Sequence, residues 1–156
     1  MISILKKLIK FISHCLIDLL VLPSKKIKPN SLLLIRLDAI GDYLMFRNFI
    51  QELKESQKYK EFSITLLGNS AWESLSEELD IEFVDRFIWL DINKFNKNFV
   101  YRYKMLKEVS SVGYEIILNS VFSREFFYND AIVKLVKAKM KIGSIGDISN
   151  MKKWQK

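Results

Sequence analysis

The sequence is poor in residues that cross-link or interrupt a chain: its 156 residues include one cysteine, two prolines and five glycines. The single Cys15 excludes a disulfide framework and favours a reducing compartment. Because glycine and proline dominate turns, their scarcity leaves little room for long loops. Hydrophobic residues make up 49% and charged residues 28%, which predicts one folded domain of ordinary size rather than a disordered chain.

A net charge of +7 allows three classes of partner, namely nucleic acid, an anionic membrane surface or an acidic substrate. The sequence lacks zinc-finger spacing and an RNP-like segment. No predicted helix interleaves a dense Arg and Lys face with exposed aromatic residues, and the lysines are spread through the chain. We therefore expect no nucleic-acid partner.

Residues 2–22 form the most hydrophobic stretch of the chain. On a helix their polar members fall within an arc of roughly 140°: Ser3, Lys6, Lys7, Lys10, Ser13, His14 and Asp18. This pattern predicts an amphipathic helix about 30 Å long. His14 and Cys15 are adjacent but lack partners at metal-ligand spacing, so we expect no metal there.

Three placements of this helix remain open. A transmembrane span would put Lys10, His14 and Asp18 into hydrocarbon, and residues 23–26 do not resemble a signal-peptide cleavage site. An interfacial helix with its lysines toward anionic headgroups fits best. It would place the chain peripherally on the inner face of the cytoplasmic membrane. The alternative is that the helix packs on its own domain.

After a polar linker at 23–30, strand-like and helix-like segments alternate. Apolar runs predict strands at 31–37, 62–67, 83–90, 114–118 and 139–142. Helical spacing predicts helices at 42–56, 70–79, 92–110 and 124–138. The alternation predicts an α/β, Rossmann-like parallel sheet with helices on both faces. Ligands bind at the carboxyl edge of such sheets, which places residues 38–42, 69–70, 91 and 119–124 on one rim.

The first strand-to-helix turn contains one glycine, Gly41, where a dinucleotide fingerprint needs three. Asp42 follows it at the positive end of the next helix. A carboxylate there occupies the anion site itself, so the turn disfavours phosphate, and the carboxylate could accept a proton from a hydroxyl. The alternative is that Asp42 caps the helix. Arg36 and Asp38 either face the rim or pair with a neighbour.

A second polar cluster follows the fourth predicted strand. Asn119, Ser120 and Arg124 can bind sugar hydroxyls or phosphates. Alternatively, Ser123 caps a helix that begins at Arg124. Trp72 and Trp89 are expected to pack in the core or at the rim rather than to form a sugar platform.

Four segments of the chain carry a resemblance to a known family. The first is Leu33-Leu-Ile-Arg36-Leu-Asp38-Ala-Ile-Gly41-Asp42-Tyr-Leu, an apolar strand with a basic residue followed by Gly-Asp and a helix. The others are Phe83-Val-Asp85-Arg-Phe-Ile, Gly113-Tyr-Glu-Ile-Ile-Leu118-Asn119 and Ala138-Lys-Met-Lys141-Ile-Gly143. In this order the segments resemble the opening strand and the "yVDevi", "yDlvinl" and "ak.riGf" strands of glycosyltransferase family 9, the ADP-heptose:lipopolysaccharide heptosyltransferases. The resemblance covers residues 31–147.

The resemblance implies the N-terminal, acceptor-binding half of a two-domain GT-B glycosyltransferase, with Asp42 as the general base. From their place on the predicted rim, we expect the acceptor site to include Arg36, Asp38, Gly41, Asn119, Ser120 and Arg124. No metal or cofactor is implied beyond a nucleotide-sugar co-substrate. The family often has Ser or Thr where Asp38 stands, and Pro where Asn48 stands, which bears on acceptor identity.

The hydropathy pattern and the resemblance together imply a domain plan. It assigns residues 1–22 to the amphipathic helix, 23–30 to the linker, 31–147 to the acceptor-binding domain and 148–156 to a tail where a donor-binding domain would follow. We expect the donor half on a separate or longer chain, so that this chain alone is inactive.

The first functional hypothesis is therefore sugar transfer, for example of heptose, to a lipopolysaccharide-type or other lipid-linked saccharide. The alternative is a truncated, non-catalytic binding module. A third hypothesis, an unrelated nucleotide-binding α/β protein, is disfavoured by the missing glycine fingerprint.

Overall fold

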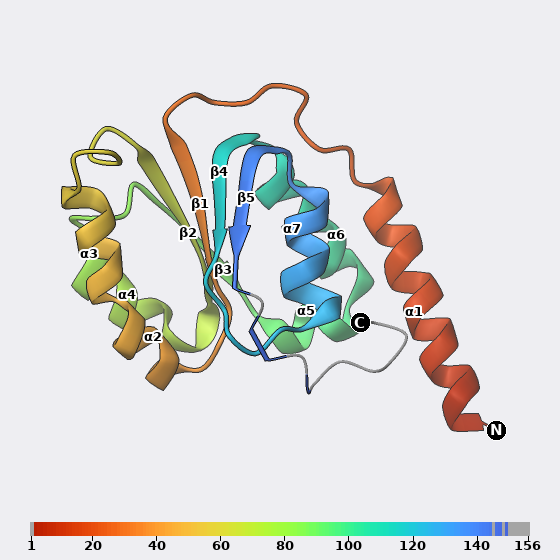
Figure 1. The fold of residues 1–156 in the computed structure, drawn as a ribbon. Coiled ribbons are helices and arrows are strands. Elements are labelled where there is room, and N and C mark those ends of the chain that lie inside the picture. The colour runs from red at the N-terminus through yellow and green to blue at the C-terminus, as the bar shows by residue number, and fades with distance from the viewer. Residues whose placement is uncertain (1, 145, 148, 150–156) are drawn as a thin grey trace.

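The fold is known from a computed structural model that describes residues 2–144, 146, 147 and 149. Five parallel strands form one sheet in the order β3-β2-β1-β4-β5. Their bounds are Ser31–Arg36 (β1), Ser63–Asn69 (β2), Arg86–Leu90 (β3), Tyr114–Asn119 (β4) and Ala138–Gly143 (β5). Helices cover both faces of the sheet (Figure 1), which confirms the predicted Rossmann-like α/β class.

The central strand β1 explains why its sequence is a continuous apolar run. All six of its residues are buried, and successive side chains point to opposite faces of a sheet. Leu32 and Leu34 pack into one hydrophobic core with Tyr43. Leu33 and Ile35 pack into the other core. A strand buried on both faces needs apolar side chains at every position.

The order of the strands creates a switch point beside β1. From β1 the chain builds the sheet outward through β2 and β3, and then returns to the other side of β1 with β4. The loops that leave the carboxyl ends of β1 and β4 therefore diverge. Open α/β sheets bind ligands in the crevice at such a point.

Several helices differ from the predicted ones. The helix expected at 42–56 begins earlier and divides at Arg47 into α2 (Ile40–Phe46) and α3 (Asn48–Glu55). The segment expected at 70–79 starts with a short 3₁₀ turn, η1 (Ser70–Trp72), before α4 (Glu73–Asp80). The third strand begins at Arg86 rather than at residue 83, and the ends of the other strands differ from the predicted ones by one or two residues at most.

Polar side chains set the other boundaries. The helix expected at 92–110 divides into α5 (Ile92–Lys97) and α6 (Phe99–Ser110), because the Asn98 side chain accepts a hydrogen bond from the Tyr101 N–H and begins a new helix. The helix expected at 124–138 is shorter than predicted and begins with a π-helical turn. This turn, η2 (Phe126–Asp130), precedes the short α7 (Ala131–Leu135).

The N-terminal helix α1 (Ile2–Leu20) lies along one side of the domain against α6 (Figure 1). The linker that follows it is also fixed, because Ile27 pairs with Gly113 and the Lys28 N–H donates to the Gly113 carbonyl at 2.8 Å. Among the described residues, no helix is long and apolar enough to cross a membrane. Most of the expected tail at 148–156 lies outside the described residues.

Candidate functional site

The turn after β1 presents Asp42 at the carboxyl edge of the sheet. Helix α2 begins at Ile40, and its N-cap residue Ala39 makes no side-chain cap. Asp42 is therefore the third helical residue rather than the cap, and its side chain is exposed. A Cβ built on Gly41 would meet nothing within 4 Å, so the turn has open space beside the carboxylate.

The guanidinium of Arg36 holds this edge together. It is 4% exposed and lies 4.3 Å from the centroid of the Phe46 ring. One nitrogen, Nη2, donates to the main-chain oxygen of Asp42 at 2.8 Å and pairs with Oδ2 of Asp38 at 2.8 Å. The other, Nη1, donates to the main-chain oxygen of Ser120 at 2.8 Å. Arg36 thus connects both diverging loops and is a positioning residue.

Side-chain hydrogen bonds from β2 and η1 hold the main chain of Asp38, and the Asp38 side chain is largely buried. Its carbonyl accepts hydrogen bonds from Trp72 Nε1 at 3.1 Å and Asn69 Nδ2 at 3.3 Å. Its Oδ1 is buried without a hydrogen-bond partner among the described residues. Burial raises the pKa of the Asp38 carboxyl although the Arg36 cation opposes that shift. The pairing with a neighbour that was one expectation for Arg36 and Asp38 is therefore present.

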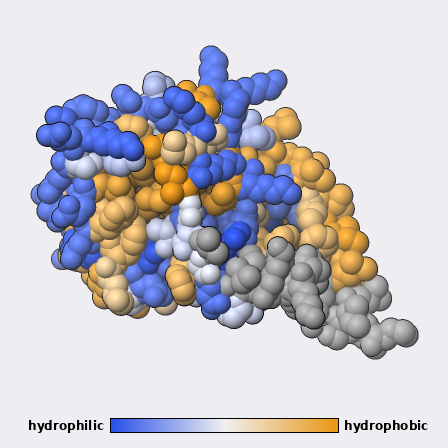
Figure 2. All heavy atoms as spheres, in the orientation of Figure 1, coloured by the Kyte–Doolittle hydropathy of each residue, from blue (hydrophilic) through white to orange (hydrophobic). Residues whose placement is uncertain are grey.

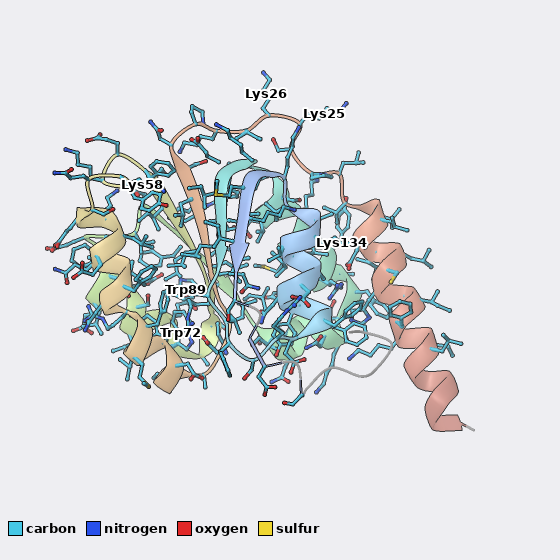
Figure 3. All side chains as sticks on the ribbon, viewed as in Figure 1. Lys25, Lys26, Lys58, Trp72, Trp89 and Lys134 are labelled. Carbon is cyan, nitrogen blue, oxygen red and sulfur yellow. The ribbon has the colours of Figure 1, made fainter. Side chains whose placement is uncertain are left out.

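The two tryptophans pack as predicted. Trp72 is 1% exposed and stacks on Tyr43 with ring centroids 4.3 Å apart. Trp89 meets Trp72 edge-on (Figure 3). A Cβ on Gly68 would come within 2.7 Å of the Trp72 ring, so glycine is required for this packing. The cluster packs against the turn that contains Asp38, and it does not form a platform for a sugar ring.

The end of β4 supplies the opposite side of the switch point. Asn119 is 8% exposed, and its Oδ1 has no hydrogen-bond partner in the described part of the chain. Ser120 follows it, and its Oγ lies 3.5 Å from both Arg36 Nη1 and the carbonyl of Ile35. Buried polar atoms nearly always have a partner. The unpaired oxygens of Asp38 and Asn119 therefore mark acceptors that a bound hydroxyl could satisfy.

Two titratable residues of this region were not foreseen. Burial raises the pKa of the Glu125 carboxyl. Burial, followed by the negative charges of Glu125 and Asp38, raises the pKa of Tyr128 to about 12. Tyr128 therefore lies near both Glu125 and Asp38. The aromatic run at 126–128 resembled an ordinary helix face, and no pattern in the sequence signals a π-helical turn.

Arg124 is not brought into the Arg36 cluster by any described contact. Its guanidinium pairs with Asp130, with Nη2 2.9 Å from Oδ2. Its main-chain N–H donates to the carbonyl of Asp147 at 3.0 Å, and Ser123 pairs with the same segment. The expectation that Ser123 caps a helix at Arg124 was wrong, because the helical turn starts at Phe126.

Carboxylates dominate the edge. Asp38 and Asp42 lie close to one buried cation, Arg36, whose Nη atoms already have hydrogen-bond partners. The negative charge at this edge favours a neutral, hydroxyl-rich ligand over a phosphate. In the described residues no three His, Cys, Asp or Glu side chains form a group that could hold a metal ion.

A separate pocket of about 260 Å³ lies at the opposite edge of the sheet. Its lining includes the first residues of four strands, Ser31, Ser63, Arg86 and Tyr114. None of the predicted site residues lines it. The predicted residues, with the exception of Arg124, meet instead where β1 and β4 end.

No family model, curated protein or solved structure matches this chain.

Proposed function

We propose that this chain is the acceptor-binding half of an inverting glycosyltransferase that acts on a lipopolysaccharide-type or other lipid-linked saccharide. The observation that carries the proposal is the exposed carboxylate of Asp42, whose main chain is held at the switch point by Arg36. The ordered resemblance of residues 31–147 to glycosyltransferase family 9 supports it. A heptose is the donor sugar that this resemblance suggests.

In the proposed reaction, Asp42 accepts the proton of an acceptor hydroxyl while that oxygen forms a bond to the anomeric carbon of the donor. The bond from that carbon to the nucleoside diphosphate breaks, and the configuration inverts. The diphosphate leaves with the electron pair on its oxygen. The donor is bound by a second Rossmann-like unit, and alignment of the two substrates between the units supplies much of the remaining acceleration.

The other edge residues bind or position the acceptor. Oδ1 of Asp38 and Oδ1 of Asn119 accept hydrogen bonds from sugar hydroxyls, since both are buried acceptors without a partner among the described residues. Gly41 leaves room for the sugar beside the carboxylate. Arg36 and Ser120 fix the two loops. Arg124, which pairs with Asp130, contributes to acceptor binding from outside the Arg36 cluster.

Acceptor binding tests the proposal on this chain alone. A deacylated lipopolysaccharide core oligosaccharide is titrated into ¹⁵N-labelled protein. We expect the largest amide shifts at 38–42 and 119–120, with Asn119→Leu weakening binding by about tenfold through loss of a hydrogen bond. Residues 114 and 63, at the opposite edge, serve as internal controls. Shifts confined to that opposite edge, or none at all, would contradict the proposal.

Transfer activity separates the catalytic hypothesis from the non-catalytic one. The chain alone is expected to bind acceptor without turnover, because the proposed donor site lies on a second unit. Turnover should appear when that unit is supplied. Sugar transfer by the isolated chain would contradict the assignment of the donor site to a second unit. A complete assembly that binds acceptor but never transfers sugar would identify a binding module.

A further inference from the structure

Two polar side chains of helix α1, Asp18 and His14, face its own domain. The carboxylate of Asp18 forms a bidentate pair with Arg102 of α6, with both N–O distances 2.7 Å. His14 is 2% exposed and lies between the rings of Phe99 and Phe127. Arg102 is itself 1% exposed and also donates to the Phe127 carbonyl. The rotation of the helix about its axis is thus fixed.

As a result, the apolar stripe of α1 faces outward. Its members are 47–77% exposed and share one side of the helix, at positions Leu8, Ile9, Ile12, Leu16, Leu19 and Leu20. The space-filling view shows hydrophobic side chains along the outer edge of the molecule over this helix (Figure 2). Contiguous exposed apolar surface on one element marks an interaction site.

The charges around the stripe are basic. The first 30 residues contain six lysines and a single acidic residue, Asp18. Asp18 points inward and is paired with Arg102, so the outer surface of α1 carries no carboxylate. Lys25 and Lys26 project from the segment that follows α1 (Figure 3). An apolar stripe flanked by cations matches the layers of an anionic bilayer surface, where acyl chains lie beneath negative headgroups.

We propose that the outward face of α1 docks on an anionic lipid bilayer, with the helix lying in the interface. In this orientation His14 and Asp18 face the protein, and the aliphatic stripe enters the membrane. The inference is independent of the proposed sugar transfer, since it rests on α1 alone.

The geometry adds a consequence for substrate access. The strands run toward the lower edge of the view in Figure 1, and α1 extends along one side with its N-terminal end reaching beyond the carboxyl ends of the strands. A bilayer against the outer face of α1 would lie on the α6 side of the sheet, whereas Asp42 belongs to α2, which covers the other face (Figure 1). A lipid-linked acceptor would therefore have to extend past the carboxyl edge of the sheet to reach Asp42.

Vesicle sedimentation tests the docking surface on the full chain. The probes are vesicles of phosphatidylcholine alone and vesicles that also contain phosphatidylglycerol. The test variant is Ile12→Glu with Leu19→Glu, and the matched control is Ile81→Glu with Met140→Glu, two exposed hydrophobic positions outside α1. We expect wild type and control to bind the anionic vesicles equally. The α1 variant should bind at least about tenfold less, and neutral vesicles should bind wild type at least about tenfold less.

Circular dichroism spectra that match wild type show that the α1 variant is folded. Equal vesicle binding by the α1 variant and wild type would overturn the proposal. The proposal would also be overturned if wild-type protein did not bind anionic vesicles and instead formed a dimer that the α1 substitutions dissociate. The stripe would then be an interface between two copies. Neither result depends on whether the chain binds a saccharide.

Discussion

Arg36 Nη2 donates a 2.8 Å hydrogen bond to the main-chain oxygen of Asp42, so the last residue of β1 fixes the first turn of α2. The contact is with the peptide and leaves the Asp42 carboxylate directed to solvent. The same guanidinium pairs with Asp38 and donates to the Ser120 carbonyl. One buried cation therefore sets the relative positions of both loops at the switch point.

Replacing Arg36 with Met should destabilise the protein by about 3–5 kcal/mol, because the buried Asp38 carboxylate would lose its partner. The free energy of unfolding in urea measures the effect. Arg86→Met is the control: its pair with Glu108 is exposed, with side-chain accessibilities of 40% and 47%, so its cost should stay below about 1 kcal/mol. Equal costs for the two substitutions would contradict the organising role of Arg36.

Gly68 and Gly41 should respond differently to alanine. At Gly68 a methyl group collides with the Trp72 and Trp89 rings, and overpacking should cost about 1–3 kcal/mol in unfolding free energy. At Gly41 there is open space, and alanine favours the helix by up to about 1 kcal/mol. If the sugar occupies that space, Gly41→Ala should weaken acceptor binding while leaving stability equal or higher. Unchanged acceptor affinity would place the sugar elsewhere.

The Asp18–Arg102 pair should control whether α1 stays docked. Asp18→Asn leaves Arg102, 1% exposed, without its counter-charge and should cost about 1–3 kcal/mol, since the Asp18 side chain is 26% exposed. Hydrogen exchange of the α1 amides reports the loss locally. The matched control, Asp91→Asn, removes a charge but keeps a side-chain oxygen at the N-cap of α5, and it should leave α1 protection unchanged. Equal α1 protection in wild type and Asp18→Asn would show that apolar contacts alone hold the helix.

His14 should make α1 docking sensitive to pH. Burial lowers the pKa of this imidazole below 6.5, helped by the charges of Arg102 and Lys10 and opposed by Asp18 and by the hydrogen bond to the Lys10 carbonyl. The unfolded state then binds more protons than the folded state between the lowered pKa and 6.5. The stabilising contribution is therefore complete above pH 6.5 and is lost as pH falls through the folded-state value.

Because His14 is the single histidine of the chain, one imidazole signal in an NMR titration gives its pKa directly. His14→Gln should flatten the pH dependence of stability between about pH 5 and 7. A wild-type titration midpoint at or above 6.5 would contradict the assignment.

The sequence predicted the architecture well because its strongest signals concern burial on both faces of a sheet. The continuous apolar run of β1 identified a central strand, and Gly41 with Asp42 located the turn at the carboxyl edge. Contacts between distant residues were not predictable in the same way. Nothing local in the sequence indicates that Arg36 reaches Ser120, 84 positions away, or that Asp18 pairs with Arg102.

The same limitation explains the errors. The spacing of residues 2–22 revealed two faces of a helix but not which face meets the domain, because that depends on the position of Arg102 on α6. Glu125 and Tyr128 were missed since a π-helical turn changes which side chains face the edge. Asp42 was interpreted as a cap or a base because the actual helix start, Ile40, lies within the range over which helix ends are uncertain.

The central claim is that Asp42 is the general base, and Asp42→Asn in the enzyme assembled from this chain and its donor-binding unit tests it most directly. The rate of sugar transfer at saturating acceptor and donor is compared with wild type and with Asp91→Asn, another aspartate at the carboxyl edge. The account predicts that kcat falls by about 10²- to 10⁴-fold for Asp42→Asn, with acceptor KM within about threefold of wild type and Asp91→Asn near wild type. Full turnover by Asp42→Asn would contradict it.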